Sequence, residues 1–158
     1  MADNHIPDHS EYLMSGLKLD MNKLIIYTDG GARGNPGPAG IGAVIYATKP
    51  SKENIVAEIS EYIGETTNNQ AEYRAVIAAI KKAKELGALE LDFYLDSQLV
   101  VEQLNRNFKV KHADLAPLFV KIYNEMLSFK KVVFRHIPRE ENRYADNLVN
   151  RAIDKQII

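Results

Sequence analysis

Residues 25–40 read IIYTDGGARGNPGPAG, so that an apolar run, an aspartate and a glycine-rich segment follow one another directly. Residues 23–28 have the character of a buried strand, and residues 41–48 form a second apolar run of this kind. Glycine and proline between the two runs favour a short, stiff connection, because glycine supplies unusual backbone angles and proline fixes its own. The stretch predicts two strands joined by a tight link, with Asp29 directly after the first strand.

The same glycines also raise the possibility of a phosphate-binding loop, but neither common template fits. The motif GxxxxGK[ST] is absent, and Ala32 stands where a dinucleotide-binding loop has its second glycine. Pro36 and Pro38 prevent a helix from starting here, so no helix N-terminus can face a phosphate. A structural hairpin link leaves Asp29 unexplained, because a carboxylate that ends a buried strand has to be paired, solvated or bound to a metal.

The rest of the chain is typical of one α/β domain. Residues 54–63 alternate as a third strand, and short links between the first three strands predict an antiparallel meander. Residues 69–86 then carry apolar residues at helical spacing, with Thr67 or Asn68 as the cap at the start and Gly87 at the end.

Two further strands and three further helices complete the pattern. Strands are predicted at 90–95 and 130–137, and helices at 97–105, from a cap at Asp114 to about Phe129, and from Glu140 to about Ile157. This order predicts a mixed five-stranded sheet with helices on its faces. We expect residues 1–20 to be a flexible extension and residues 21–158 to be the domain.

Composition excludes several classes of protein. Of the 158 residues, 46% are hydrophobic and 26% are charged, which fits a single globular domain. The chain has no cysteine, which excludes disulfides and thiolate zinc sites and indicates a reducing compartment. No apolar run approaches the roughly 20 residues of a membrane span, and the polar, acidic N-terminus does not resemble a signal peptide. We therefore expect a cytoplasmic protein that does not interact with membranes.

The charge of the chain gives no strong signal for nucleic acid. Residues 1–20 contain four acids and one lysine, a net charge of −3, whereas the whole chain carries −1. The difference leaves +2 for residues 21–158. This is mildly basic, and far from the strongly basic domain that by itself would indicate phosphate binding.

Four carboxylates occupy comparable positions in the predicted fold. Asp29 and Asp96 each follow an apolar strand, and Glu72 and Asp146 each lie early in a helix. Singly, each has an ordinary structural explanation in turn chemistry or the helix dipole. Together they are expected beyond the carboxyl ends of strands, where sites gather in open sheets.

Such a cluster would carry a charge of −4, which two divalent cations would balance. Carboxylate oxygens suit Mg²⁺, and two ions about 3.5–4 Å apart support in-line displacement at phosphorus without a protein nucleophile. Other chemistries fit poorly. Ser97 has no nucleophile elbow around it, and the HIPDH segment that contains His5 and His9 is not the HExxH motif of a zinc enzyme.

Four motifs in this order give the chain a specific resemblance to the type 1 ribonuclease H family, over residues 22–155. They are YTDGGARGNPGPAGIGAVI (27–45), TTNNQAEYRA (66–75), LDSQLVVEQL (95–104) and HIPREENRYADNLVNRA (136–152). The resemblance implies a five-stranded mixed sheet, an antiparallel meander of three strands plus two parallel ones. It also implies endonucleolytic cleavage of the RNA strand of RNA–DNA hybrids, which leaves 3′-hydroxyl and 5′-phosphate ends.

The family's catalytic and metal-binding acids fall on Asp29, Glu72, Asp96 and Asp146. Two Mg²⁺ ions are implied, with Mn²⁺ as a substitute. The resemblance further implies that part of the glycine-rich stretch contacts substrate. Gly30, Ala32, Asn68 and Gln98 would touch RNA ribose hydroxyls, and Asn35, Thr67 and Asn69 the other strand; the two asparagines at 68 and 69 could instead be simple helix caps.

The sequence departs from well-known members of the family in two ways. The part after the third acid is short, and its segment NRNFKVKH (105–112) holds only Arg106, Lys109 and Lys111 in place of a basic protrusion. We also expect no separate hybrid-binding domain, because residues 1–20 are too short for one. Seven residues before the last acid, where many members carry a histidine, this chain has Arg139; the nearest histidine is His136. Arg139 is either a solvated loop cation or a partial replacement that attracts phosphate.

Alternatives within and outside this family stay open from the sequence. Double-stranded RNA or DNA are candidate substrates besides the hybrid, and a catalytically inactive nucleic-acid-binding module is a third interpretation. The presence of all four acids favours an active enzyme. We expect a monomer.

Overall fold

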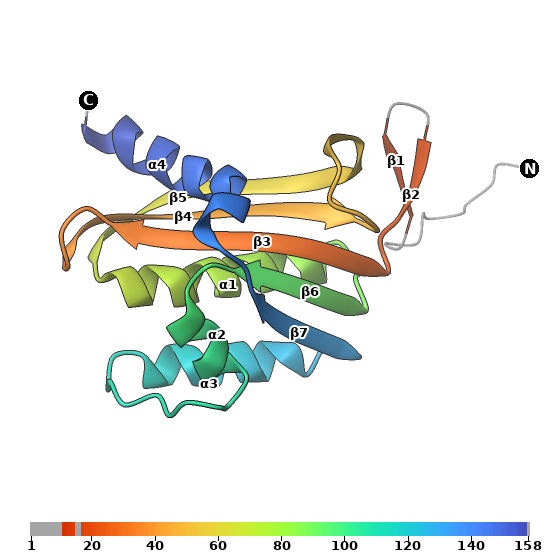
Figure 1. Cartoon of the computed structure of the whole chain (residues 1–158). Helices are drawn as coiled ribbons and strands as arrows, with labels where there is room; N and C mark the ends of the chain where they lie inside the picture. Colours follow the sequence, from red (N-terminus) through yellow and green to blue (C-terminus); the bar gives the residue numbers. More distant parts are fainter. Residues whose placement is uncertain (1–10, 15–16, 158) are drawn as a thin grey trace, which may run out of the picture.

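The computed structural model describes residues 11–14 and 17–157, and its centre is a five-stranded mixed sheet in the order β5-β4-β3-β6-β7 (Figure 1). Antiparallel pairs join β3 to β4 and β4 to β5, whereas β6 runs parallel to both β3 and β7. The predicted meander and the two parallel strands are confirmed. The strands span Lys23–Ala32 (β3), Gly37–Ala47 (β4), Ile55–Thr66 (β5), Glu90–Leu95 (β6) and Lys131–His136 (β7).

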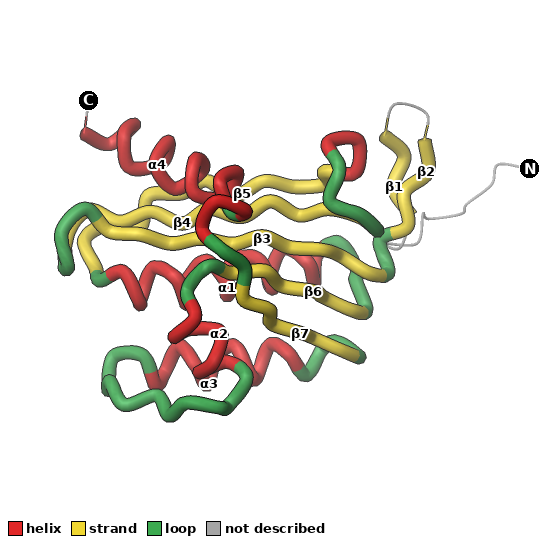
Figure 2. The backbone as a smooth tube through the Cα atoms, viewed as in Figure 1, coloured by secondary structure: helices red, strands yellow, loops and turns green. Residues whose placement is uncertain are grey.

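Helices cover both faces of the sheet, as predicted (Figures 1 and 2). On one face, α1 packs against β3, β4 and β5, α2 packs against β6 and β7, and α3 packs against α1. On the other face, α4 packs against β3, β4 and β5. The helices span Asn68–Glu85 (α1), Gln98–Leu104 (α2), Ala116–Met126 (α3) and Arg143–Ile157 (α4), and short 3₁₀ helices span Lys52–Asn54 (η1) and Arg139–Glu141 (η2).

Alternation along the strands divides the core into two layers. Leu24 and Ile26 of β3 are fully buried beneath α1, with the side chains of β6 beside them. Ile25 and Tyr27 point to the other face, where a smaller cluster forms around Leu148 of α4. Apolar side chains therefore pack on both faces of β3, beneath α1 on one face and beneath α4 on the other.

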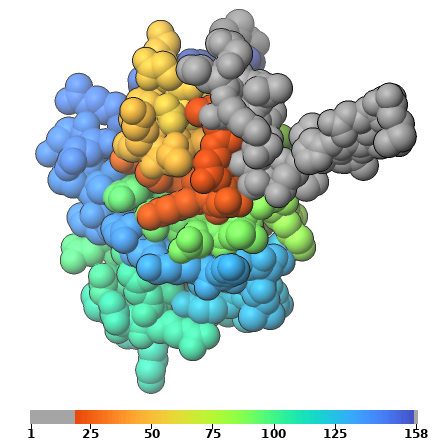
Figure 3. All heavy atoms as spheres, turned by 90° about the vertical axis from the view of Figure 1, so that its right-hand side faces the viewer, coloured from red at the N-terminus to blue at the C-terminus, as the bar shows by residue number. Residues whose placement is uncertain are grey.

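Part of the predicted N-terminal extension is described as an antiparallel hairpin of β1 (Glu11–Met14) and β2 (Leu17–Asp20). Residues 1–10 and 15–16 lie outside the described residues, so the flexibility of the extension stays a prediction. Figure 3 views the end of the molecule at which β3, β6 and β7 begin, with η1 (yellow) and the α2–α3 segment (blue-green) at opposite ends.

None of the helices in the described part of the chain is long and apolar enough to cross a membrane.

The predicted end of the first strand at Thr28 and the predicted start of the second at residue 41 are both wrong, since β4 begins at Gly37. β3 does not end at Thr28 but continues through Asp29 to Ala32, because Gly31 and Ala32 pair with Gly40 and Ala39 of β4. Only residues 33–36 connect the two strands. The hydrophobic pattern of the sequence ends at Thr28, because glycine contributes little to it. The pairing of β3 with β4 nevertheless continues to Ala32.

The predicted cap at Asp114 is wrong. α3 begins at Ala116 without a side-chain cap, and the Asp114 carboxylate accepts a hydrogen bond from the Gln70 side chain (2.8 Å). The last helix also begins later than predicted, at Arg143, because η2 occupies residues 139–141. The caps of α1 are confirmed: Thr67 accepts a bond from the Gln70 backbone N–H, and Gly87 has a positive φ of 78°.

Candidate active site

Asp29 and Glu72 are brought together by an unusually close approach of β3 to α1. A Cβ atom at Gly30 would lie 2.2 Å from the carbonyl carbon of Ala71, a distance that no side chain tolerates. Glycine at position 30 therefore lets the helix lie directly on the strand. The neighbours of this contact, Asp29 on the strand and Glu72 on the first turns of the helix, are both buried as a result.

A second close approach places the last acid. A Cβ atom at Gly42 of β4 would lie 2.4 Å from the carbonyl oxygen of Ala145 in α4. Gly42 is the cross-strand partner of Asp29. The first turns of α4, which carry Asp146, therefore rest on the sheet next to Asp29.

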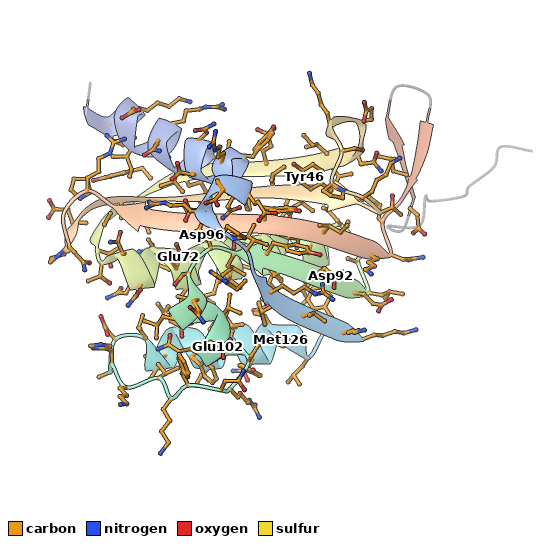
Figure 4. The ribbon with its side chains drawn as sticks, in the orientation of Figure 1. Tyr46, Glu72, Asp92, Asp96, Glu102 and Met126 are labelled. Atoms are coloured by element: carbon orange, nitrogen blue, oxygen red, sulfur yellow. The ribbon has the colours of Figure 1, made fainter. Side chains whose placement is uncertain are left out.

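Three of the four predicted acids form a compact cluster. Oxygen atoms of Asp29, Glu72 and Asp96 all lie within 4.8 Å of one another. Figure 4 labels Glu72 and Asp96, which lie between α1 and the carboxyl end of β6. Asp146 borders the same cavity, whose volume is about 380 Å³. The cavity is lined by Asp29, Gly30, Gly31, Ala32, Arg33, Asn68, Asn69, Glu72, Asp96, Ser97, Arg139, Asp146, Val149, Asn150 and Ile153.

The cluster is electrostatically unfavourable when no cation is bound. Burial raises the pKa of Asp29 to about 7, and the charges of Asp96 and Asp146 act in the same direction, while a hydrogen bond with Glu72 opposes them. Burial, followed by the charge of Asp29, raises the pKa of Glu72 well above its ordinary value. A site of this kind retains protons near neutral pH that a bound cation would replace.

The donor set fits a hard divalent cation. All the clustered groups are carboxylates, the ligands that Mg²⁺, Ca²⁺ and Mn²⁺ prefer. Glu72 Oε2 is buried and has no hydrogen-bond partner among the described residues. A buried acceptor without a donor is costly, and a cation at this position would satisfy it.

Only some of the predicted substrate-binding residues line the cavity. Gly30, Ala32, Asn68 and Asn69 line the cavity, whereas Gln98 is exposed at the start of α2 and only its neighbour Ser97 borders the cavity. Thr67 caps α1.

Hydrogen bonds join three of these predicted residues to one another. The Ala32 backbone N–H donates to Asn68 Oδ1 (2.7 Å), and the Asn68 backbone N–H donates to Asn35 Oδ1 (3.0 Å). The β3–β4 connection is therefore held against the start of α1 beside the acids.

Arg139 and His136 differ in their relation to the cavity. Arg139 is one of its lining residues, whereas His136, at the end of β7, is exposed and does not line it. Sequence reasoning missed the lining residues Arg33, Ser97 and Asn150. The position of Arg33 within the glycine-rich stretch could have indicated that it lies at the site. In the structure, Arg33 pairs with Asp154 of α4 at 2.6 Å.

Comparisons with known proteins agree with this geometry. The model of the reverse transcriptase-like family matches residues 27–152. A bifunctional protein, Rv2228c, of Mycobacterium tuberculosis is 46% identical over 132 residues, which are 84% of this chain but only 36% of that protein. The chain thus spans about a third of the length of this curated relative.

Two further relatives match over nearly their whole length. Ribonuclease H of Rickettsia bellii is 31% identical over 88% of this chain and 89% of its own. The structure of LC11-RNase H1 in complex with an RNA/DNA hybrid has a TM-score of 0.79 and 48% identity, and covers 85% of this chain and 99% of that one. With the fold and the acid cluster in agreement, the chain belongs to the type 1 ribonuclease H family.

Proposed function

We propose that the chain is a metal-dependent endoribonuclease that hydrolyses the RNA strand of RNA–DNA hybrids and leaves 3′-hydroxyl and 5′-phosphate ends. The observation that carries the proposal is the cluster of Asp29, Glu72 and Asp96, with carboxylate oxygens within 4.8 Å of one another in a cavity that Asp146 also borders. Membership of a family in which LC11-RNase H1 was crystallised with an RNA/DNA hybrid supports the choice of substrate.

The four acids are proposed to hold two Mg²⁺ ions, with Mn²⁺ as a substitute. When bound, these ions would supply the Lewis acidity that hydrolysis of a phosphodiester needs. The protein's own contribution is to keep the carboxylates close and partly desolvated. This arrangement favours cations over protons above the raised pKa of Asp29, which is about 7.

The polar residues around the acids are proposed to recognise the two strands. Gly30, Ala32, Asn68 and Gln98 would contact ribose hydroxyls of the RNA, because the 2′-hydroxyl distinguishes RNA from DNA. Asn35, Thr67 and Asn69 would contact the other strand. The hydrogen bonds among Ala32, Asn68 and Asn35 support this role, since they fix the asparagine side chains before substrate arrives.

A cleavage assay with three labelled duplexes tests the proposal. With Mg²⁺, we expect cutting of RNA–DNA and no cutting of DNA–DNA; RNA–RNA serves as the test of the alternative double-stranded RNA substrate. Replacement of 2′-hydroxyls by hydrogens around one site should block cleavage at that site. Efficient cutting of the all-DNA duplex would contradict the assignment. The proposal includes a monomeric, cytoplasmic enzyme, which light scattering and cell fractionation would check.

The variant Asp29→Asn links this activity to the acid cluster. We expect it to lower the cleavage rate by more than the roughly 10–100-fold that loss of an outer partner of a metal ligand costs. Glu85→Gln is the matched control, because Glu85 is an exposed acid of α1 that pairs with Lys82. Cleavage by Asp29→Asn at the wild-type rate would overturn the proposed site.

A further inference from the structure

Asn142 is a buried residue that has no role in the reaction proposed above, and its side chain contacts the Asp96 carboxylate. It lies directly before α4 and is 1% exposed. Its side-chain Nδ2 donates to Asp96 Oδ2 (2.7 Å) and to the backbone carbonyl oxygen of Thr28 (2.9 Å). Thr28 immediately precedes Asp29 in β3. One amide group therefore ties the carboxylate that follows β6 to the strand that carries Asp29.

The orientation of this amide is fixed by chemistry. Both partners are acceptors, a carboxylate and a carbonyl oxygen, so only the nitrogen of the amide can face them, and both of its N–H groups are used. The segment that contains Asn142 is itself held at the end of β6, where the Ile137 N–H donates to the Leu95 carbonyl oxygen (2.9 Å). Figure 2 shows this connection passing from β7 beside the end of β6 to α4.

The main chain of Asn142 has a separate task. Its carbonyl oxygen accepts the backbone N–H of Asp146 (3.1 Å), which begins the helix that carries the fourth acid. Any substitution at position 142 retains this carbonyl group. Side-chain variants therefore test the contact with Asp96 without removing the hydrogen bond that starts α4.

We propose that Asn142 is a positioning residue, whose side-chain amide holds the Asp96 carboxylate in the orientation that receives a divalent cation. The inference rests on the metal site of the proposed function. Asp96 is only partly buried and lies within 4.8 Å of two other carboxylates, so repulsion favours its rotation towards solvent. A charge-assisted hydrogen bond to one oxygen opposes that rotation. Because Asn142 is buried, it acts through Asp96 and does not touch substrate.

Asn142→Ala is tested against Asn54→Ala as a matched control. Asn54 is also buried, and its Nδ2 donates to the Ala47 carbonyl oxygen (2.7 Å) in the η1 turn, so its loss removes a comparable bond away from the acids. Calorimetric titration of the full chain with Mn²⁺, without substrate, measures the metal site directly. We expect Asn142→Ala to weaken Mn²⁺ binding at least about tenfold, the usual effect of losing an outer partner of a metal ligand.

Kinetics give a second readout that a purely structural role would not produce. For Asn142→Ala, the Mg²⁺ concentration for half-maximal cleavage should rise by a similar factor, while KM for the hybrid at saturating Mg²⁺ stays unchanged. Asn54→Ala should lose thermal stability yet bind Mn²⁺ like the wild type. Unchanged Mn²⁺ affinity in a folded Asn142→Ala would overturn the proposal.

A measurement on the wild type decides the question even where Asn142→Ala does not fold. The side-chain amide signals of Asn142 in ¹H–¹⁵N NMR spectra should move during a Mg²⁺ titration, and those of Asn54 should not. Asn142 signals that stay in place while Mg²⁺ binds would overturn the proposal. If the wild type cleaves no hybrid, the proposed function fails, but the Mn²⁺ comparison still decides the role of Asn142.

Discussion

At the scale of single residues, the buried carboxyl of Asp29 makes the stability of the metal-free protein depend on pH. Its pKa rises from an ordinary value of 3.8 to about 7 in the folded protein, mainly through burial. Between these values the unfolded chain releases a proton that the folded protein retains. The free energy of unfolding therefore falls as pH rises through this window, by about 1.4 kcal/mol per pH unit from this group, and levels off above it.

Urea unfolding of chelator-treated protein from pH 4 to 8 measures this dependence. Asp29→Asn should remove the part of the fall that comes from Asp29, while the raised pKa of Glu72 still contributes, so that the variant is more stable than the wild type above pH 7. Mg²⁺ should restore stability to the wild type at that pH, because it binds only the folded site. If the two metal-free proteins show parallel stability curves across the range, Asp29 is not held in the environment described here.

Arg139 gives a prediction about the pH dependence of catalysis. It lines the catalytic cavity, whereas His136 does not. Arginine stays charged at all working pH values, so it can attract a phosphate but cannot transfer protons as histidine does. We expect Arg139→Ala to lower turnover about tenfold, or about 1.4 kcal/mol of barrier.

The pH–rate curve separates Arg139 from His136. At a saturating Mg²⁺ concentration, at which the cation replaces the proton held by Asp29, it should show no step near the ordinary histidine pKa of about 6.5, and His136→Ala should leave its shape unchanged. A step near neutrality that disappears in His136→Ala would show that the histidine takes part.

The four acids could be predicted from the sequence because each stands out against an apolar strand or a helix start. Asn142 could not be found in this way. Its two partners lie 46 and 114 residues away, and nothing in the local pattern ENRYAD distinguishes a buried donor from a loop asparagine. Arg33 was hidden for a similar reason, since its pairing with Asp154 of α4 exists only after folding.

At the scale of elements, the contact between β3 and α1 depends on Gly30. A Cβ atom there would meet the backbone of Ala71 at 2.2 Å, and backbone cannot move aside as a flexible side chain can. Overpacking usually costs about 1–3 kcal/mol, and here it would also separate Asp29 from Glu72. We expect Gly30→Ala to destabilise the protein by at least the upper part of that range and to abolish cleavage.

Gly31→Ala is the matched control for this prediction. A Cβ atom at Gly31 would lie 3.7 Å from the nearest atom, Val149 Cγ1, which is an ordinary contact. Thermal unfolding should therefore be close to wild type. If the two alanine variants behave alike, the close approach of β3 and α1 does not assemble the site.

The bounds of segments with a clear hydrophobic periodicity were predicted well, whereas the bounds of segments without such periodicity were not. The strand at 90–95 and the helix near 69–86 have the predicted bounds to within a residue, because their apolar side chains face one core. The extension of β3 to Ala32 has no hydrophobic pattern and is visible only through its pairing with β4. Asp114 had the right residue type for a cap, but the side chain of Gln70 competes for it.

At the scale of the whole molecule, charge distribution limits how strongly the protein can hold nucleic acid. Residues 21–158 carry a net charge of only +2. Several cations are also neutralised within the fold. Lys23 and Arg135 both pair with Asp92, and Arg33 pairs with Asp154. The protein is therefore expected to neutralise few phosphates of a bound duplex.

This expectation gives a prediction for the salt dependence of binding. Each neutralised phosphate contributes about 0.7–0.9 to the slope of log K against log salt concentration, so we expect a slope shallower than about −6. Fluorescence anisotropy with a labelled hybrid and the variant Asp29→Asn, which should bind without cutting, measures the slope across a series of KCl concentrations. Affinity should be weak at physiological salt. A steeper slope would mean that exposed lysines and arginines away from the catalytic cavity form a basic surface along the duplex, and alanine substitution of those residues would then reduce the slope by about one each.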